Sequence, residues 1–244
     1  MTIREVSALV LDCEDFKEKD AIVSLLVEEE IIRVYARGIN KITSKNRMLC
    51  QPFSRVNITI DQKGERMPLL IHGNVEKYYF RIQESLVAQT VCSVLRDIIK
   101  KSHVNHDTFV LVESVWSAFH TGEANVYTKA CILLKEILMS EGIGIQVEGC
   151  VNCSRKNKIE TISLLDGGFL CTECNANRYP KRSKQELIQY YSLMHVGKDK
   201  QEEFFDTFLF TVDDFIFIAN WFEHYTYIAL PSLRLLKSIK SIEL

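Results

Sequence analysis

Two pairs of cysteines carry the clearest chemical pattern in this sequence of 244 residues. Cys150 and Cys153 form one Cys-x2-Cys pair, and Cys171 and Cys174 form a second pair after 17 intervening residues. Zinc in structural sites prefers four soft ligands in a tetrahedron, and two thiolates on one tight turn subtend the required angle. Because four thiolates leave no open coordination position, the spacing predicts one structural zinc ion rather than a catalytic one.

Two other interpretations of these cysteines are weaker. Four unrelated cysteines would rarely fall into paired spacing, and a thioredoxin-type redox site needs one Cys-x2-Cys pair rather than two. The N-terminus lacks the basic and apolar regions of a signal peptide, so we expect a reducing compartment, where clustered thiols bind metal. The other cysteines stand in apolar surroundings and are predicted to be buried core residues; they are Cys13, Cys50, Cys92 and Cys131.

The segment between the two pairs, residues 155–170, is long enough for a β-hairpin that Gly167 and Gly168 would close. Four thiolates around one divalent ion carry two negative charges. Nearby cations are therefore expected to stabilise the site, namely Arg155, Lys156 and Lys158.

Charge is unevenly distributed along the chain. The net charge is −2, yet residues 31–66 hold eight basic and two acidic side chains, and residues 154–184 hold seven and three. A polyanionic partner needs a local positive potential rather than a positive total, so these two blocks are the candidate interfaces. The alternative, that basic loops only keep the surface soluble, stays open on charge alone.

The predicted secondary structure changes from strands to helices near residue 80. Alternating or β-branched runs predict strands at 6–11, 21–27, 31–36, 53–60, 69–71 and 75–80, and a small barrel would remove their exposed edges. Helical spacing then predicts helices over 85–100, from an N-cap at Asp107, over 124–139, from Ser183, and from Thr211 to a stop at Pro231. A short basic helix is expected to end the chain.

Several enzyme classes lack their signatures here. The sequence has no phosphate-binding Gly-Lys-Ser/Thr loop, no Gly-x-Gly-x-x-Gly, no Gly-x-Ser-x-Gly and no His-Glu-x-x-His. The acidic runs at 28–30 and 213–214 fit a turn and a helix N-terminus better than paired catalytic carboxylates. No apolar run approaches the roughly 18 residues that span a bilayer. We therefore expect a binding protein with no enzymatic activity.

Taken together, the chain resembles RecO, a family of bacterial recombination-mediator proteins. The resemblance covers essentially the whole chain, and its most specific part is the zinc segment in this order and context. The stretches that carry it are 8–11 with 16–20, the loop 36–44 with 51–53, the segment 150–174 including Asp166-Gly167-Gly168-Phe169-Leu170-Cys171, and the end from 222–225 to 236–238.

The resemblance implies an α+β multidomain fold. An N-terminal OB-fold β-barrel, residues 1–80, would precede a helical domain built from 81–145 and 183–244, with the zinc-binding segment 146–182 inserted into it. It also implies a cytoplasmic, nucleoid-associated protein that binds single- and double-stranded DNA and anneals strands coated with the single-stranded DNA-binding protein. Such a protein would work with RecR to load RecA, without a membrane or small-molecule partner.

Particular side chains follow from this resemblance. The cations expected to contact DNA are Arg33, Arg37, Lys41, Lys45, Arg47 and Arg55. Tyr35 and Phe53 would either stack on bases or pack in the core. A groove for the acidic tail of the single-stranded DNA-binding protein would combine an apolar pocket of Val94, Ile98, Leu133 and Ile137 with a rim of Lys100, Lys101, Lys129 and Lys135.

Two rival functions stay open at this point. One is a zinc-ribbon interaction module whose barrel binds protein rather than nucleic acid. The other is a metal-dependent nuclease, which would need open-site carboxylates or histidines that the sequence does not group together.

Overall fold

The computed structural model describes residues 2–41 and 43–242, so Ile42 of the predicted basic loop lies outside the described residues. The chain forms two compact units. The first contains residues 1–123 and 234–244, and the second contains residues 124–233. The four segment boundaries expected from the sequence stay predictions.

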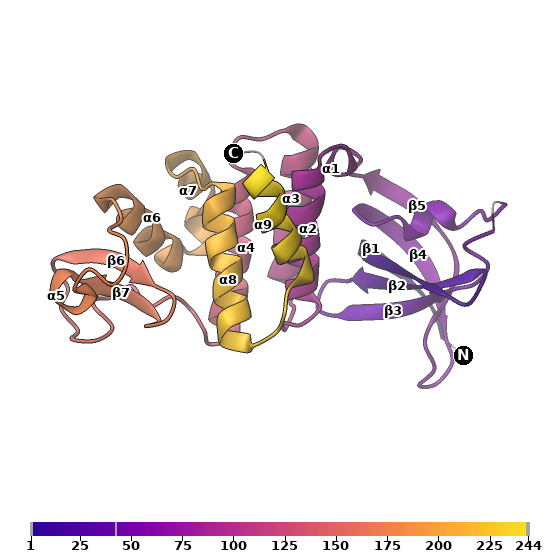
Figure 1. Ribbon diagram of the computed structural model, residues 1–244. Helices are drawn as coiled ribbons and strands as arrows, with labels where there is room; N and C mark the ends of the chain where they lie inside the picture. Colours follow the sequence, from indigo (N-terminus) through magenta and orange to yellow (C-terminus); the bar gives the residue numbers. More distant parts are fainter. Residues whose placement is uncertain (1, 42, 243–244) are drawn as a thin grey trace. The chain divides into compact units, whose positions relative to one another are not determined.

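Five strands form the sheet of the first unit (Figure 1). They are β1 (Thr2–Phe16), β2 (Asp20–Leu26), β3 (Ile31–Ala36), β4 (Ser54–Gln62) and β5 (Leu69–Tyr78). The hydrogen-bonded order is β1-β2-β3-β5-β4, and because β1 also pairs with β4, the ladder closes on itself. A single parallel pair, Tyr35 with Leu69, joins β3 to β5. Closure leaves no long edge strand exposed, as the sequence predicts.

The prediction of two short strands at 69–71 and 75–80 is wrong, because β5 is continuous through Gly73. Gly73 pairs with Ile58 of β4, where a Cβ atom would come within 2.4 Å of the Asn57 carbonyl oxygen. Glycine at this position therefore allows close approach of two strands and does not mark a turn.

Alternate residues of the strands fill the interior of the barrel. Its core includes Val10, Val23, Val34 and Ile58. A short 3₁₀ helix, η1 (Arg47–Cys50), follows the basic loop and contributes Leu49 and Cys50 to the same core. The end of the loop is thus held by apolar burial.

Helices complete the first unit: α1 (Arg81–Glu84), α2 (Leu86–Ile99), α3 (His106–Thr121) and most of α9 (Pro231–Ile242). Ser85 caps α2 through a bond from the Ala88 amide. The prediction that Asp107 caps α3 is wrong. Asn105 does so, because its side chain and that of Thr108 form a reciprocal capping box, while Asp107 lies in the first turn.

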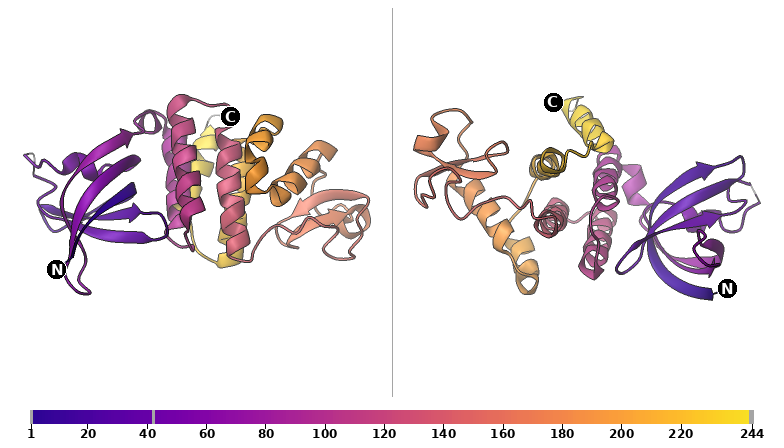
Figure 2. Two further views of the ribbon diagram at one scale, coloured as in Figure 1. Left: turned by 180° about the vertical axis from the view of Figure 1, so that it is seen from behind. Right: turned by 90° about the horizontal axis from the view of Figure 1, so that it is seen from below.

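The second unit joins helices to a small hairpin. Its elements are α4 (Val126–Ser140), β6 (Ile159–Ser163), β7 (Gly168–Cys171), α5 (Thr172–Asn175), α6 (Lys184–His195), η2 (Lys198–Lys200), α7 (Gln201–Thr207) and α8 (Val212–Thr226). Figure 2 shows α4 and α8 side by side, as their contacts require. The predicted hairpin between the cysteine pairs is confirmed as β6 and β7.

The N-caps predicted for two helices of this unit are confirmed. Ser183 and Thr211 both form capping boxes, with Glu186 and Asp214 respectively. Pro231 does not end the preceding helix, which stops at Thr226. It begins α9, where a missing backbone N–H costs nothing. Among the described residues, no helix combines the length and apolar character that crossing a bilayer would require.

Candidate metal centre and nucleic-acid interface

Each cysteine pair lies on a tightly bonded turn. In the first, the Ser154 amide donates to the Cys150 carbonyl at 2.7 Å, and the Cys150 amide donates to the Arg155 carbonyl at 2.8 Å. In the second, Cys171 ends β7 and Cys174 lies one turn later in α5. The hairpin brings the two turns together, so all four thiols come from local structure that the spacing predicts.

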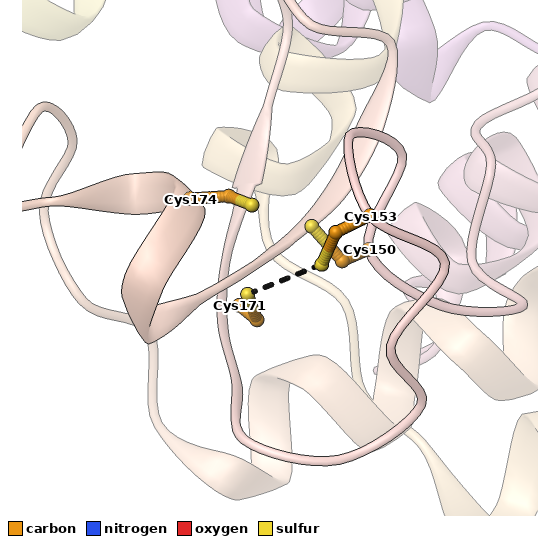
Figure 3. Close-up of side chains that lie close together, drawn as sticks. All are labelled: Cys150, Cys153, Cys171 and Cys174. Carbon is orange, nitrogen blue, oxygen red and sulfur yellow. Dashed lines mark hydrogen bonds between the residues drawn. The ribbon is translucent and has the colours of Figure 1, made fainter.

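The four sulfur atoms point toward one another (Figure 3). All of them lie within 4.8 Å of one another, and the Cys153 and Cys171 sulfurs are 3.7 Å apart. Zn–S bonds of about 2.3 Å in a tetrahedron separate the sulfurs by about 3.8 Å, whereas a disulfide needs about 2.05 Å. The cluster therefore fits a four-coordinate metal ion. Cys150 and Cys171 are buried and Cys153 is exposed.

The protonation of these thiols is uneven. Burial opposes ionisation of Cys150, but the backbone amides of Cys171, Asn152 and Cys153 lower its pKa to about 6. Hydrogen bonds to Cys153 and Cys150 raise the pKa of Cys174 to about 12. One thiolate is thus preformed, and a bound cation would have to displace the proton of Cys174.

A buried amide supports the second turn. Asn175 is fully buried, and its side chain donates to Glu160 Oε2 and to the Tyr179 carbonyl oxygen, both at 3.0 Å. It also accepts from the Tyr179 amide at 3.0 Å. Glu160 is paired with Lys181 at 2.6 Å. These bonds fix α5 against β6, which sequence reasoning did not anticipate because Glu160 lies 15 positions away from Asn175.

Asp166, in the hairpin turn, links the first cysteine turn to the segment after the second. Its carboxylate accepts from Ser163 at 2.5 Å, from Asn152 at 3.3 Å and from Arg178 at 3.2 Å. The Ser163 hydroxyl is the main reason that the pKa of Asp166 lies below its usual value. Arg178 also donates to the Cys174 carbonyl at 2.9 Å.

Arg155 and two glycines of the hairpin lie close to the cysteine turns; stabilisation of the site by Arg155, Lys156 and Lys158 stays a prediction. Arg155 forms an ion pair with Glu173, which is the main reason that the pKa of Arg155 is raised. The charges of Cys171 and Cys153 raise this pKa further. Gly167 has a φ of +91°, and a Cβ on Gly168 would lie 2.1 Å from the Gln146 carbonyl oxygen. The hairpin can therefore return only with glycine at these positions.

The cations predicted to contact DNA separate into two groups. Four are exposed and form no ion pair within the part of the chain that the structure describes: Arg37, Lys41, Lys45 and Arg47. All four belong to the loop that connects β3 to η1 or to η1 itself. Among residues 2–41 and 43–123, the cations predicted to contact DNA that form no ion pair all lie in this loop or in η1.

Two other arginines of this set form ion pairs within the protein. Arg33 pairs with Glu14 at 3.3 Å. Arg55 donates through Nη1 to both carboxylate oxygens of Glu113, at 2.7 and 2.9 Å, and its Nε lies 2.8 Å from Glu76. Arg55 thus connects the barrel to α3. Contact of Arg33 and Arg55 with DNA stays a prediction.

The basic loop is anchored to the turn between β1 and β2. Asp20 accepts a short hydrogen bond from the Tyr35 hydroxyl and a 2.7 Å bond from the Gly38 amide. The bond from Tyr35 is the larger cause, and that from Gly38 the second, of the lowered pKa of Asp20. Asn40 donates to Asp15 at 2.8 Å. The loop is thus held at its start by acidic residues and at its end by apolar burial.

The two candidate aromatic residues have different roles. Phe53 is buried, edge-on to Trp116 at 5.6 Å, so it is a core residue and cannot stack on a base. Tyr35 is partly exposed and meets Phe16 edge-on at 6.0 Å. Phe16 is 40% exposed, and Lys17 Nζ lies 5.3 Å from the centre of its ring. Phe16 was missed in the sequence because its exposure depends on the pairing of β1 with β2.

The residues named for a groove that binds an acidic tail belong to two units, α2 to the first and α4 to the second, so the groove stays a prediction. Val94, Ile98, Leu133 and Ile137 are all buried in core positions. Lys100 bridges Asp12 and Glu14, and Lys135 is buried, paired with Glu136 and bonded to the Val196 carbonyl. Lys129 lies over the Phe205 ring, and Lys101 is exposed. The four apolar residues thus pack inside the protein, as the apolar face of an amphipathic helix usually does.

Comparisons with known proteins agree on one family. Residues 1–79 match the family described as "Recombination protein O N terminal". The chain is 27% identical to "DNA repair protein RecO" of Syntrophomonas wolfei over 172 residues, covering 69% of this chain and 68% of that protein. It is 27% identical to the protein of the same name from Bacillus pumilus, covering 68% and 66%. The match thus spans about two thirds of each relative's length.

Proposed function

The chain belongs to the RecO family, and from this premise we propose that it is a DNA-binding recombination mediator in DNA repair, without an active site of its own. We take its barrel as an OB-fold, a fold whose second and third strands and adjoining loops bind oligonucleotides. One observation carries the proposal. The exposed Phe16 of β1 and the partly exposed Tyr35 of β3 contact each other beside the loop that holds the unpaired cations.

This combination suits single-stranded nucleic acid. Cations track the phosphates, and aromatic rings stack on bases of any sequence. Arg37 and Lys41 flank the part of the loop that bonds to β1 and β2, through Gly38 to Asp20 and through Asn40 to Asp15. Such a face would bind two complementary strands without sequence preference, which is what strand annealing requires. Double-stranded DNA would be bound through the same phosphate contacts.

The partners proposed are RecR, the RecA recombinase and the single-stranded DNA-binding protein, in a cytoplasmic, nucleoid-associated setting. The binding site for the tail of the last protein stays a prediction. The four-cysteine cluster would hold one structural Zn²⁺, with Cys150, Cys153, Cys171 and Cys174 as ligands. Bound zinc would supply cross-linking of the two turns and no chemistry on a substrate.

Salt-dependent binding tests the proposal directly. Fluorescence anisotropy of a labelled, unstructured oligonucleotide should show affinity that falls steeply with salt. The double variant Arg37→Glu/Lys41→Glu should bind more weakly and with a shallower slope of log K against log[salt], by about 1.4 for two lost single-strand phosphate contacts. A matched charge reversal in the second basic block, Lys156→Glu/Lys158→Glu, should bind like the unmodified protein.

The outcomes separate the rival functions. Loss of binding in the second double variant alone would move the interface to the zinc segment. Salt-independent or absent binding by the unmodified protein would favour a protein-interaction module. Annealing is tested separately, by energy transfer between complementary labelled strands coated with the single-stranded DNA-binding protein, where the same loop variant should slow pairing.

A further inference from the structure

The β1–β2 turn, residues 17–19, lies against the start of the basic loop. The Asn40 amide donates to the Lys19 carbonyl at 3.1 Å, and the Asn40 side chain donates to the Asp20 carbonyl at 3.4 Å. The Gly38 amide donates to the Asp20 carboxylate, which directly follows the turn, at 2.7 Å. The turn and the start of the loop are therefore bonded to each other within one unit of the chain.

Two lysines of this turn carry charges that are open to a ligand. Lys17 and Lys19 are exposed, and neither forms an ion pair among the residues that the structure describes. Lys17 Nζ lies 5.3 Å from the centre of the Phe16 ring, and this ring contacts Tyr35 edge-on at 6.0 Å. Cations therefore extend from the basic loop, through the turn, to the exposed aromatic pair.

We propose that Lys17 and Lys19 bind phosphates of the DNA strand, so that the β1–β2 turn and the basic loop form one cationic surface beside Phe16 and Tyr35. This inference rests on the proposed function and adds a second segment to its interface. A base that stacks on an exposed ring brings its own backbone phosphates close to that ring, and cations there attract them. Lys17 is placed for this contact because it already lies beside the Phe16 ring.

The backbone of Lys17 supports a role for its side chain. Its φ is +58°, in the left-handed region that glycine and asparagine adopt at lower cost than lysine does. A long charged side chain at such a turn position points to a role outside local folding. Asparagine at this position would keep the turn and remove the charge, so it separates an effect on binding from an effect on folding.

Three acidic side chains lie close to the two lysines in the sequence. Asp15 and Asp20 both accept hydrogen bonds from the loop, through Asn40 and Gly38 respectively, so they hold the loop in place. Glu18 is exposed in the turn and forms no ion pair among the described residues. Its charge would repel a phosphate bound by the neighbouring lysines. Removing this charge should therefore strengthen binding.

Anisotropy of a labelled thymidine oligonucleotide tests the proposal on the full chain. Lys17→Asn and Lys19→Gln should each bind about 5-fold more weakly in about 0.1 M salt, and each should reduce the slope of log K against log[salt] by about 0.7, as one lost single-strand phosphate contact requires. Glu18→Gln should bind more tightly. The controls are Arg81→Gln and Glu84→Gln, two exposed positions of α1, and both should bind like the unmodified protein. They follow the C-terminal end of β5, whereas the basic loop follows a strand that pairs with the N-terminal end of β5.

Two further measurements keep folding separate from binding. Urea unfolding of Lys17→Asn should give a midpoint no lower than that of the unmodified protein, because asparagine suits the left-handed backbone. Acetylation of lysines, read by peptide mass spectrometry, should show that the oligonucleotide protects Lys17 and Lys19 in the unmodified chain. Lys237, an exposed residue of α9, should stay reactive.

Three results would overturn the proposal. The first is binding by both lysine variants like that of the unmodified protein while Arg37→Glu/Lys41→Glu binds weakly, which would leave the proposed function in place. The second is an unchanged affinity of Glu18→Gln, and the third is a failure of the oligonucleotide to protect the two lysines. If the unmodified protein binds no oligonucleotide at all, both this surface and the proposed function are rejected.

Discussion

Arg55 donates to both carboxylate oxygens of Glu113, at 2.7 and 2.9 Å, across 58 positions of sequence. The pair joins β4 of the barrel to α3, and the Tyr79 hydroxyl donates to the same carboxylate at 2.9 Å. A side chain that the sequence offers as a phosphate ligand is therefore part of the protein's internal framework.

Replacing Arg55 by Lys should destabilise the protein without weakening oligonucleotide binding. Lysine has a single nitrogen and cannot reproduce the contacts of Nη1 with Glu113 and of Nε with Glu76, so about 1–2 kcal/mol of unfolding free energy should be lost, at the lower end for a partly exposed pair. Arg47→Lys, at an exposed and unpaired position, is the control and should leave stability unchanged. Urea unfolding and anisotropy measure the two quantities. Weaker binding by Arg55→Lys at unchanged stability would return Arg55 to the interface.

The metal cluster should bind one divalent ion per chain and release protons as it does so. Because the pKa of Cys150 is about 6, this thiol is already ionised at pH 8, whereas Cys174, at about 12, must lose its proton on binding. Fewer than four protons should therefore appear per metal, as measured by calorimetry in buffers of different ionisation enthalpy. Release of four protons would contradict the preformed thiolate.

Removing one ligand should unfold the hairpin. Cys171→Ser takes away a buried sulfur at the end of β7, so metal binding should weaken and α5 should lose its amide protection in hydrogen exchange. Cys131→Ser, a buried thiol outside the cluster, is the control. If Cys171→Ser still binds one zinc and keeps its protection, the cluster is not the metal site.

The contact between Asp20 and Tyr35 should be visible in a pH titration. The hydroxyl bond lowers the pKa of Asp20, so its stabilising effect is complete above about pH 4 and is lost as the pH falls through the lowered value. Tyr35→Phe should therefore raise the pKa of Asp20 toward its usual range, as followed by NMR of the side-chain carboxyl. Tyr79→Phe removes a hydroxyl elsewhere and should not move it. An unchanged Asp20 titration in Tyr35→Phe would reject the contact.

Phe16 should contribute to oligonucleotide affinity if the barrel face binds bases. Its ring is 40% exposed, and stacking of one base contributes about 1–3 kcal/mol, so Phe16→Ala should weaken binding by about 5-fold to 150-fold. The salt dependence should stay the same, because no phosphate contact is removed. Met48→Ala, which removes another exposed apolar side chain near the loop, should bind normally. Equal loss in both variants would point to a general effect on the loop.

Local features of the fold were predictable because neighbours in sequence determine them. The spacing of Cys150, Cys153, Cys171 and Cys174 required two turns and a hairpin, and the structure confirms that they cluster. Ser183 and Thr211 cap the helices that follow them, because a cap acts on amides three residues away. The N-cap of α3 was predicted two residues too late, because the side chains of Asn105 and Asp107 are both able to bond backbone amides at a helix N-terminus.

What the sequence by itself determined was thus the metal cluster, the order of strands and helices and the location of the basic loop, all of which depend on short-range spacing. Only the tertiary structure decided which cations are free. Arg55 and Lys100 meet carboxylates 58 and 86 to 88 positions away, and a charge pair at that separation leaves no periodic signal. The same holds for Phe53, since only the packing of α3 on the barrel brings its partner Trp116 into contact with it.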